Sequence, residues 1–221
     1  MNKIVINLVF LLTLLITATG TAYQYIVEKN SLICIDPGHG GIDSGAVGYD
    51  GTLEKDINLT FALTLADVFI DMGYSVLLTR NTDTDLASSY SKNRKKEDME
   101  NRVNIINSSG CLLYISIHAN SYRSNQVYGA QVFYNAKCQD SMKLANLVQE
   151  RIKQDLLNTN RTALAIKDKY LVDYSVATGV LVEIGFLSNK RELTLLKDKN
   201  YQIKMAISIV EACCEFLTEN D

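Results

Sequence analysis

The sequence predicts an α/β fold in which helices cover both faces of a mainly parallel β-sheet. Short apolar runs of strand length alternate along the chain with longer segments whose apolar residues recur at helical spacing. Such alternation is typical of parallel sheets whose strands are connected by helices. Composition supports a folded core, because 47% of the 221 residues are hydrophobic and 21% are charged.

Strands are expected where a short apolar or alternating run ends at a polar residue or a turn. The expected strands lie at residues 32–35, 75–78, 111–117, 129–134, 170–174 and 180–182. The segment between the second and third runs, residues 81–97, is polar, charged and irregular, so we expect a surface loop there.

Helices are expected where apolar residues return every three or four positions. Ile57, Phe61 and Leu65 keep this spacing in residues 54–72, and Gly73 ends that helix. Residues 141–157 form a second amphipathic pattern. A short helix is predicted at 100–106, and a C-terminal helix is expected at 201–217. No internal repeat or second domain is evident, so one domain is expected over residues 32–218.

The first residues are not expected to belong to this domain. One lysine precedes an apolar stretch, and small residues follow up to Ala22, which is the pattern of a secretory signal peptide. Residues 1–22 are therefore expected to be a signal peptide or an uncleaved N-terminal membrane anchor. Either interpretation predicts an exported, extracytoplasmic protein that touches the membrane only through this segment.

Charge and cysteine content argue against a nucleic-acid-binding protein and against a disulfide-stabilised scaffold. A net charge of −3 at pH 7 gives no electrostatic case for a nucleic-acid partner. The five cysteines are odd in number and form no CxxC pair, so no disulfide framework is expected.

Three of the expected strands end in residues that carry chemistry. Asp36 and His39 follow the first strand, His118 follows the third, and Glu183 follows the last. The carboxyl ends of parallel strands meet at one edge of a sheet, where open α/β folds carry their sites. These two histidines are the only ones in the chain.

Two histidines and carboxylates at one edge predict a catalytic zinc site. Two histidines with one glutamate are an established ligand set that leaves a position for water, and a further carboxylate must then move the proton. The candidate carboxylates are Asp36, Asp43, Glu54, Asp56 and Glu183. Spacing alone does not decide between Glu54 and Glu183 as ligand and base. Asp36 is also expected to support His39.

Two other chemistries are not supported by the residues. Ser116 and His118 lie two residues apart on one strand, too close for a catalytic dyad, and no GxSxG motif is present. The glycines at positions 38, 40 and 41 are not followed by Gly-Lys-Ser/Thr, so they do not form a phosphate-binding P-loop.

The motifs together resemble a known family. Residues 36–41 (DPGHGG), 45–48 (GAVG) and 54–59 (EKDINL) are similar to the opening of the zinc N-acetylmuramoyl-L-alanine amidases of type 3. Residues 116–120 (SIHAN) and 129–134 (GAQVFY) resemble the middle of these enzymes, and 181–189 (LVEIGFLSN) resemble the end. The resemblance covers nearly everything from residue 32 to residue 217. Two loops differ from the family pattern. The family often has a proline shortly before the Leu-Val-Glu strand, where this chain has Thr178-Gly179, and often has Asn-Pro after Phe-Leu-Ser, where this chain has Asn189-Lys190.

The resemblance implies a fold and a set of roles. It implies a twisted, mainly parallel six-stranded sheet flanked by helices. His39, Glu54 and His118 fall on the family's ligands for one Zn²⁺, and Glu183 falls on its catalytic glutamate. The implied substrate is peptidoglycan, cut at the amide between N-acetylmuramic acid and L-alanine.

The organisation as a leader plus one catalytic domain resembles the germination-specific amidases of spore cortex. This resemblance implies action in the forespore intermembrane space, coupling to a deacetylase that leads to muramic-δ-lactam, and a regulatory or activating protein partner. Two alternatives remain at this point: a vegetative cell-separation autolysin, and a catalytically silent amidase-like domain that binds the wall.

Overall fold

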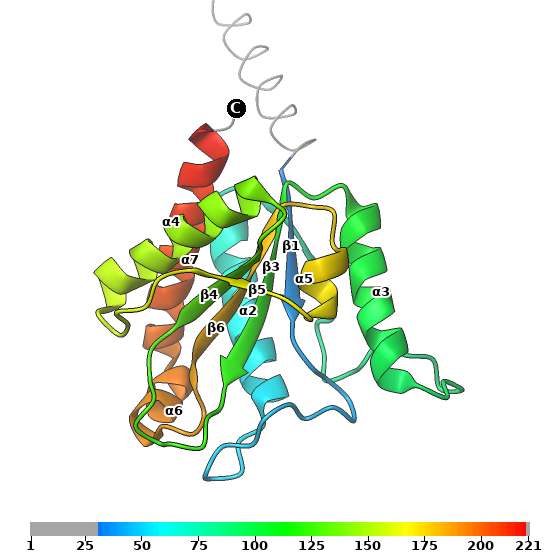
Figure 1. Cartoon of the computed structure of the whole chain (residues 1–221), viewed down its shortest axis with the longest axis horizontal. Coiled ribbons are helices and arrows are strands. Elements are labelled where there is room, and N and C mark those ends of the chain that lie inside the picture. Colours follow the sequence, from blue (N-terminus) through cyan, green and yellow to red (C-terminus); the bar gives the residue numbers. More distant parts are fainter. Residues whose placement is uncertain (1–30, 220–221) are drawn as a thin grey trace, which may run out of the picture.

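The computed structural model describes residues 31–219, which form one six-stranded sheet with helices on both faces (Figure 1). The strand order is β2-β1-β3-β6-β4-β5. The strands are β1 (Leu32–Pro37), β2 (Ser75–Leu78), β3 (Leu113–Asn120), β4 (Gln131–Asn135), β5 (Leu164–Ile166) and β6 (Gly179–Phe186). β2, β1, β3 and β6 run parallel, whereas β4 is antiparallel to β6 and parallel to β5. The predicted mainly parallel α/β sheet is confirmed.

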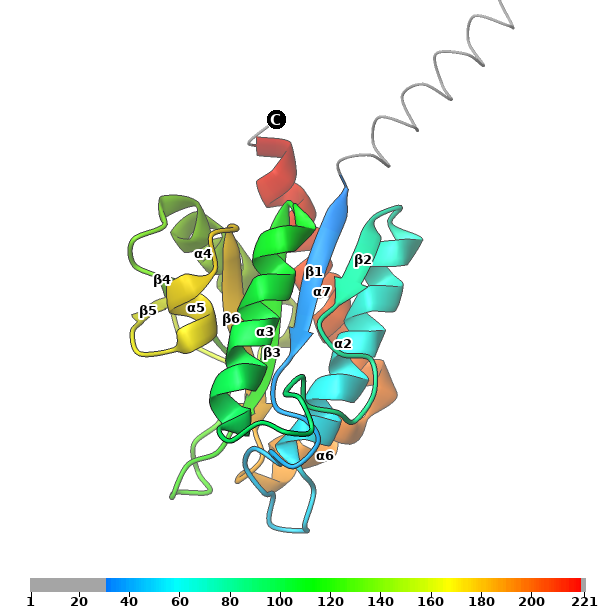
Figure 2. The same cartoon turned by 90° about the vertical axis from the view of Figure 1, so that its right-hand side faces the viewer.

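The helices divide between the two faces of the sheet (Figures 1 and 2). They are α2 (Glu54–Asp71), α3 (Arg94–Ser109), α4 (Gln139–Leu156), α5 (Tyr170–Tyr174), α6 (Lys190–Lys197) and α7 (Lys199–Glu219). Helices α2, α4 and α7 cover one face, and α3 and α5 cover the other.

The core follows from the alternation of side chains along the central strands. Ile33 and Ile35 of β1 enter the large cluster on the α2 and α7 face, whereas Cys34 between them enters a smaller cluster with Ile106 of α3. Apolar residues on both faces are what a strand buried between two helical layers requires. Cys34 is one of five free thiols.

Residues 170–174 were predicted as a strand and are helix α5 instead. Leu171 and Val172 are buried there, and Leu171 packs into the α3-side cluster. Five residues are too few for periodicity to distinguish a helix from a strand, so burial alone made the run resemble β-structure. The sixth strand is β5, a largely exposed edge strand that the sequence analysis did not identify.

Two further helical segments differ from expectation. Helix α3 begins at Arg94 rather than near residue 100, because the Asn93 side chain accepts a hydrogen bond from the Lys96 N–H at 3.3 Å and caps it. Its first turns are mostly charged, with Lys95 and Lys96 exposed and Asp98 buried, so they show no apolar periodicity. Helix α6 was not predicted at all. Asn189 caps it in the same way, by accepting from the Glu192 N–H at 3.2 Å.

Within residues 31–219, no helix has the length and apolar character needed to cross a membrane. The predicted signal peptide or anchor at residues 1–22 lies outside the described residues.

Candidate active site

The candidate side chains gather at the carboxyl edge of the sheet. His39 follows β1, His118 lies near the end of β3, and Glu183 lies in β6. The three strands are neighbours, and His118 is the register partner of Glu183. Glu54 joins them as the first residue of α2, which packs against β3. The expected gathering at this edge is therefore present, but β3 and β6 continue past the expected strand ends, so His118 and Glu183 lie within their strands.

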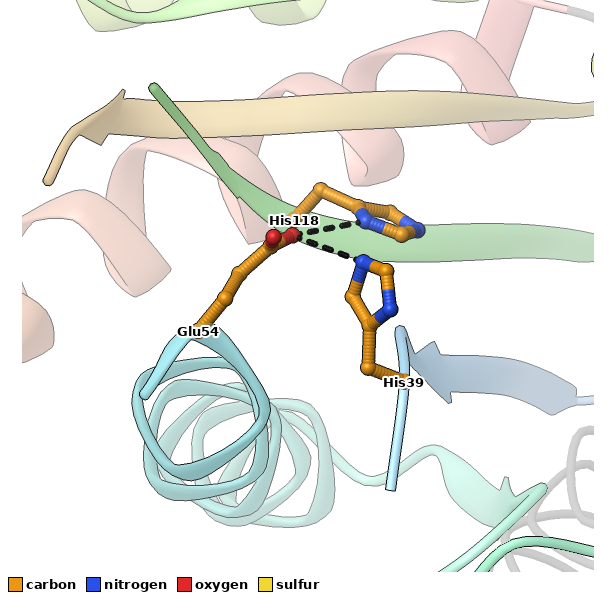
Figure 3. A group of neighbouring side chains, drawn as sticks. All are labelled: His39, Glu54 and His118. Atoms are coloured by element: carbon orange, nitrogen blue, oxygen red, sulfur yellow. Dashed lines mark hydrogen bonds and ion pairs between the residues drawn. The ribbon is translucent and has the colours of Figure 1, made fainter. Parts of the chain in front are cut away.

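His39, Glu54 and His118 form a compact group of possible metal ligands (Figure 3). One ligand atom from each lies within 4.8 Å of the others. Glu54 Oε1 is 3.1 Å from His39 Nε2 and 3.0 Å from His118 Nδ1. Two imidazole nitrogens and one carboxylate oxygen are a donor set that suits Zn²⁺.

Two glycines allow this group to pack closely. A Cβ at Gly38 would collide with the His118 ring. A Cβ at Gly45 would lie 2.6 Å from Glu54 Oε2, and Gly45 also adopts φ +64°, which disfavours other residues. The glycine-rich segment after β1 is therefore required by the geometry of the ligand group.

Glu54 is held in place as a buried anion. Its Oε2 accepts the Ala46 N–H at 2.8 Å. Burial by itself raises the pKa of the Glu54 carboxyl, but hydrogen bonds and charges from His118 and His39 outweigh burial and hold the pKa far below its ordinary value. Asp56, another candidate carboxylate, lies on the exposed side of α2 and outside the group.

Glu183 faces the same site but has different contacts. It lines a cleft of about 500 Å³ together with His39, Glu54 and His118. Its Oε2 is out of solvent contact and has no hydrogen-bond partner among residues 31–219. Burial raises the pKa of Glu183 above its ordinary value; the His118 charge opposes this effect and the Glu54 carboxylate adds to it.

Asp43, not Asp36, contacts the His39 ring. Asp43 Oδ2 lies 2.9 Å from His39 Nδ1 and leaves Nε2 directed at Glu54. Asp36 does not touch the His39 ring, since its oxygens accept from the hydroxyls of Thr79 at 2.6 Å and Ser116 at 2.7 Å. The support of His39 expected from Asp36 is indirect and runs through Arg102. A carboxylate four residues after a histidine in a glycine-rich loop was the available signal for Asp43.

Two buried arginines fix the loop that carries His39, and the sequence analysis missed both. Arg102 donates from Nη1 to Asp36 Oδ1 at 2.8 Å and from Nη2 to the His39 carbonyl at 2.7 Å. Arg80 donates to the carbonyls of Pro37 at 2.9 Å and Gly38 at 3.0 Å. Asp36 thus acts on His39 indirectly, through Arg102. An arginine within the apolar stripe of a predicted helix was a usable signal for Arg102.

Comparison with known proteins agrees with the fold and the site. Residues 33–215 match the N-acetylmuramoyl-L-alanine amidase family Amidase_3. The chain is 43% identical over 194 residues to the germination-specific N-acetylmuramoyl-L-alanine amidase of Bacillus subtilis, covering 86% of this chain and 81% of that protein. It is 34% identical over 179 residues to the amidase LytC of the same organism, covering 80% of this chain and 34% of LytC.

Solved structures give the same result. The CwlD amidase of Clostridioides difficile, determined in complex with the GerS lipoprotein, is 38% identical and superimposes with a TM-score of 0.82, covering 86% of this chain and 99% of CwlD. An N-acetylmuramoyl-L-alanine amidase from Clostridium difficile 630 is 27% identical, with a TM-score of 0.78 and coverage of 87% and 99%. The chain therefore belongs to the N-acetylmuramoyl-L-alanine amidases, a family of peptidoglycan hydrolases.

Proposed function

We propose that His39, Glu54 and His118 hold one Zn²⁺ and that Glu183 is the general base of the amidase reaction. The bond cut is the amide between the lactyl group of N-acetylmuramic acid and L-alanine. The observation that carries this proposal is that one cleft holds both the three possible ligands and a buried carboxylate oxygen with no hydrogen-bond partner in the part of the chain that the structure describes. Residues 32–218 are the catalytic domain in this proposal.

The contacts support different roles for the two glutamates. Glu54 Oε1 lies within contact distance of a ring nitrogen of each histidine. This is the position expected of a carboxylate that binds the same metal ion as the two histidines. Glu183 lies across from His118 on the next strand and keeps an oxygen free. A raised pKa brings a carboxylate closer to the operating pH, where a general base works best.

In this proposal Glu183 transfers the proton during hydrolysis, and Asp43 orients a metal ligand. A Zn²⁺ held by His39, Glu54 and His118 would supply polarisation of the scissile carbonyl and a lowered pKa of bound water. Glu183 accepts the proton of the attacking water and returns it to the amine of L-alanine as the carbon–nitrogen bond breaks. Asp43 holds the His39 ring by its other nitrogen, which fixes the orientation of the donor.

Metal content and turnover test these roles separately. In the purified full-length protein, Glu183→Gln is expected to retain one zinc and to lose about 10²–10⁴-fold in turnover of purified peptidoglycan. His118→Ala is expected to lose stoichiometric zinc. Zinc is measured by plasma mass spectrometry, and turnover by release of stem peptides.

Glu192→Gln is the matched control, because Glu192 is also a buried glutamate with a raised pKa but accepts from the Gly129 and Phe186 N–H groups away from the cleft. It is expected to keep both zinc and turnover. Normal turnover in Glu183→Gln, or full zinc in His118→Ala, would sink the assignment.

The biological setting proposed here is the spore cortex. The similarity to a germination-specific amidase of Bacillus subtilis and to the CwlD amidase supports it. In this setting residues 1–22 export or anchor the enzyme in the forespore intermembrane space, and amide cleavage prepares muramic acid for a deacetylase and muramic-δ-lactam formation. The structure of CwlD with a lipoprotein supports a protein partner for this chain as well.

The alternative setting is vegetative cell separation, which the similarity to LytC favours. Deleting the gene and analysing muramidase-digested cortex by mass spectrometry distinguishes the two. Loss of muramic-δ-lactam with normal cell separation is the result expected for the cortex role. Persistent lactam together with unseparated chains of cells would favour the vegetative role instead.

A further inference from the structure

Two lysines that line the cleft form no ion pair within residues 31–219. Lys95 lies in the first turn of α3, and Lys169 immediately precedes α5, so they come from the two helices on the same face of the sheet. Both residues are exposed. Neither forms an ion pair with any residue in the described part of the chain.

The remaining cation of the cleft is already neutralised. Arg102 also lines it, but its guanidinium is paired with Asp36 at 2.8 Å and with Asp98 at 2.9 Å. Among the lysines and arginines of the cleft, the ones free to pair with a bound anion are therefore Lys95 and Lys169, although the carboxylates of Asp43 and Asp168 also line it.

The two ammonium groups act on the catalytic end of the cleft. Lys95 lines the same cleft as Asp43, which contacts His39. The charge of Lys169 opposes the raised pKa of Glu183. An anionic group of a substrate that reaches His39 and Glu183 would thus come within the field of both lysines.

We infer that Lys95 and Lys169 bind free carboxylates of the stem peptide, next to the amide that is cut. This inference rests on the proposed placement of that amide at His39, Glu54 and His118. The second residue of a stem peptide is a D-glutamate joined through its side-chain carboxyl, so its α-carboxylate is free one residue beyond the scissile bond. Conversion of that carboxylate to an amide removes the charge.

The consequence is a preference for stem peptides whose second residue is not amidated. Ion pairs of exposed lysines are weak, so each lysine contributes about two- to fivefold in kcat/KM. The preference is also expected to shrink between about 0.05 M and 0.5 M salt, because ions screen exposed charges over shorter distances as their concentration rises.

The test compares two muramyl pentapeptides that differ only in this group, carboxylate or carboxamide, as substrates of the zinc-loaded full-length protein. Lys95→Gln and Lys169→Gln remove the cleft charges. Lys96→Gln and Lys167→Gln are matched controls, because these exposed lysines are sequence neighbours that do not line the cleft. The measured quantity is the ratio of kcat/KM for the acid to kcat/KM for the amide.

We expect the ratio to exceed one in the wild type, to fall in both cleft variants and to stay unchanged in both controls. A wild-type ratio of one, an unchanged ratio in both cleft variants, or an equal fall in all four variants would overturn the inference. Because these outcomes all require turnover, they differ from failure of the proposed function, in which zinc-loaded wild type cleaves neither substrate.

Discussion

Replacing Arg102 with methionine tests how strongly the buried charge network supports the fold. The Arg102 side chain is 1% exposed. Besides its bonds to Asp36, Asp98 and the His39 carbonyl, it donates to the Pro37 carbonyl at 2.8 Å. Methionine keeps a long side chain but leaves two buried carboxylates without their cation. Removing one partner of a buried ion pair costs about 3–5 kcal/mol of unfolding free energy.

Urea unfolding followed by circular dichroism measures this loss, with a chelator present so that metal binding does not contribute. With a denaturant slope of about 2 kcal/mol per molar, the midpoint should fall by about 1.5–2.5 M. Arg151→Met is the matched control, because Arg151 also pairs with two carboxylates, Glu211 at 3.1 Å and Glu215 at 2.8 Å, but is 31% exposed.

The exposed pairs of Arg151 are worth about 0.2–1 kcal/mol, so its variant should move the midpoint by about 0.5 M or less. Equal midpoints for the two variants would refute the reasoning, since they would show that burial of the Arg102 network has no special cost. A changed denaturant slope in Arg102→Met would signal loss of two-state unfolding and would require hydrogen exchange to measure the loss.

Three further predictions concern the site and its support. Gly38→Ala should weaken zinc binding while the fold persists, because the new methyl group displaces the His118 ring; a competition titration with a fluorescent chelator measures the change. Asp43→Asn should lower zinc affinity about 10–100-fold in the same assay, because it weakens the hold on His39 Nδ1. An unchanged affinity in either variant would contradict that contact's role. Burial raises the pKa of Asp36, but its charged and hydroxyl partners outweigh burial and hold the pKa below its ordinary value of 3.8. The stabilisation by Asp36 is therefore complete above that pH and is lost as the pH falls through the folded pKa, so Asp36→Asn should flatten the acid limb of urea stability between about pH 5 and pH 2. An acid limb as steep as in the wild type would show that other carboxylates dominate.

The central strands could be predicted from the sequence because strands buried on both faces are continuous apolar runs, and such runs are visible in the local sequence. The runs that become β1, β3 and β6 are apolar on both faces and end in polar residues at the carboxyl edge. Both histidines were identified from this pattern. Helix α5 was not, because its short apolar run is shaped by contact with α3, which no local pattern records.

The roles of Glu54 and Glu183 also could not be assigned from the local sequence. Spacing predicts that Glu54 begins a helix and that Glu183 follows an apolar strand run, but which of the two contacts both histidines depends on how α2 packs against β3. The contact between Arg102 and the His39 carbonyl could not be predicted either, because it also depends on tertiary packing. Arg102 reaches the His39 carbonyl from 63 residues away in the chain.

The order of the strands also bears on when the site can form. β6 is the last strand along the chain, yet it lies between β3 and β4 in the sheet. Until it is inserted, the edge pair β4–β5 has no partner in the rest of the sheet, and Glu183 is absent from its place beside His118. Such long-range pairing is slow to form because the intervening chain must be ordered first. Completion of the sheet and completion of the proposed catalytic group are therefore one event, and the chain is not expected to cleave its substrate before β6 is inserted.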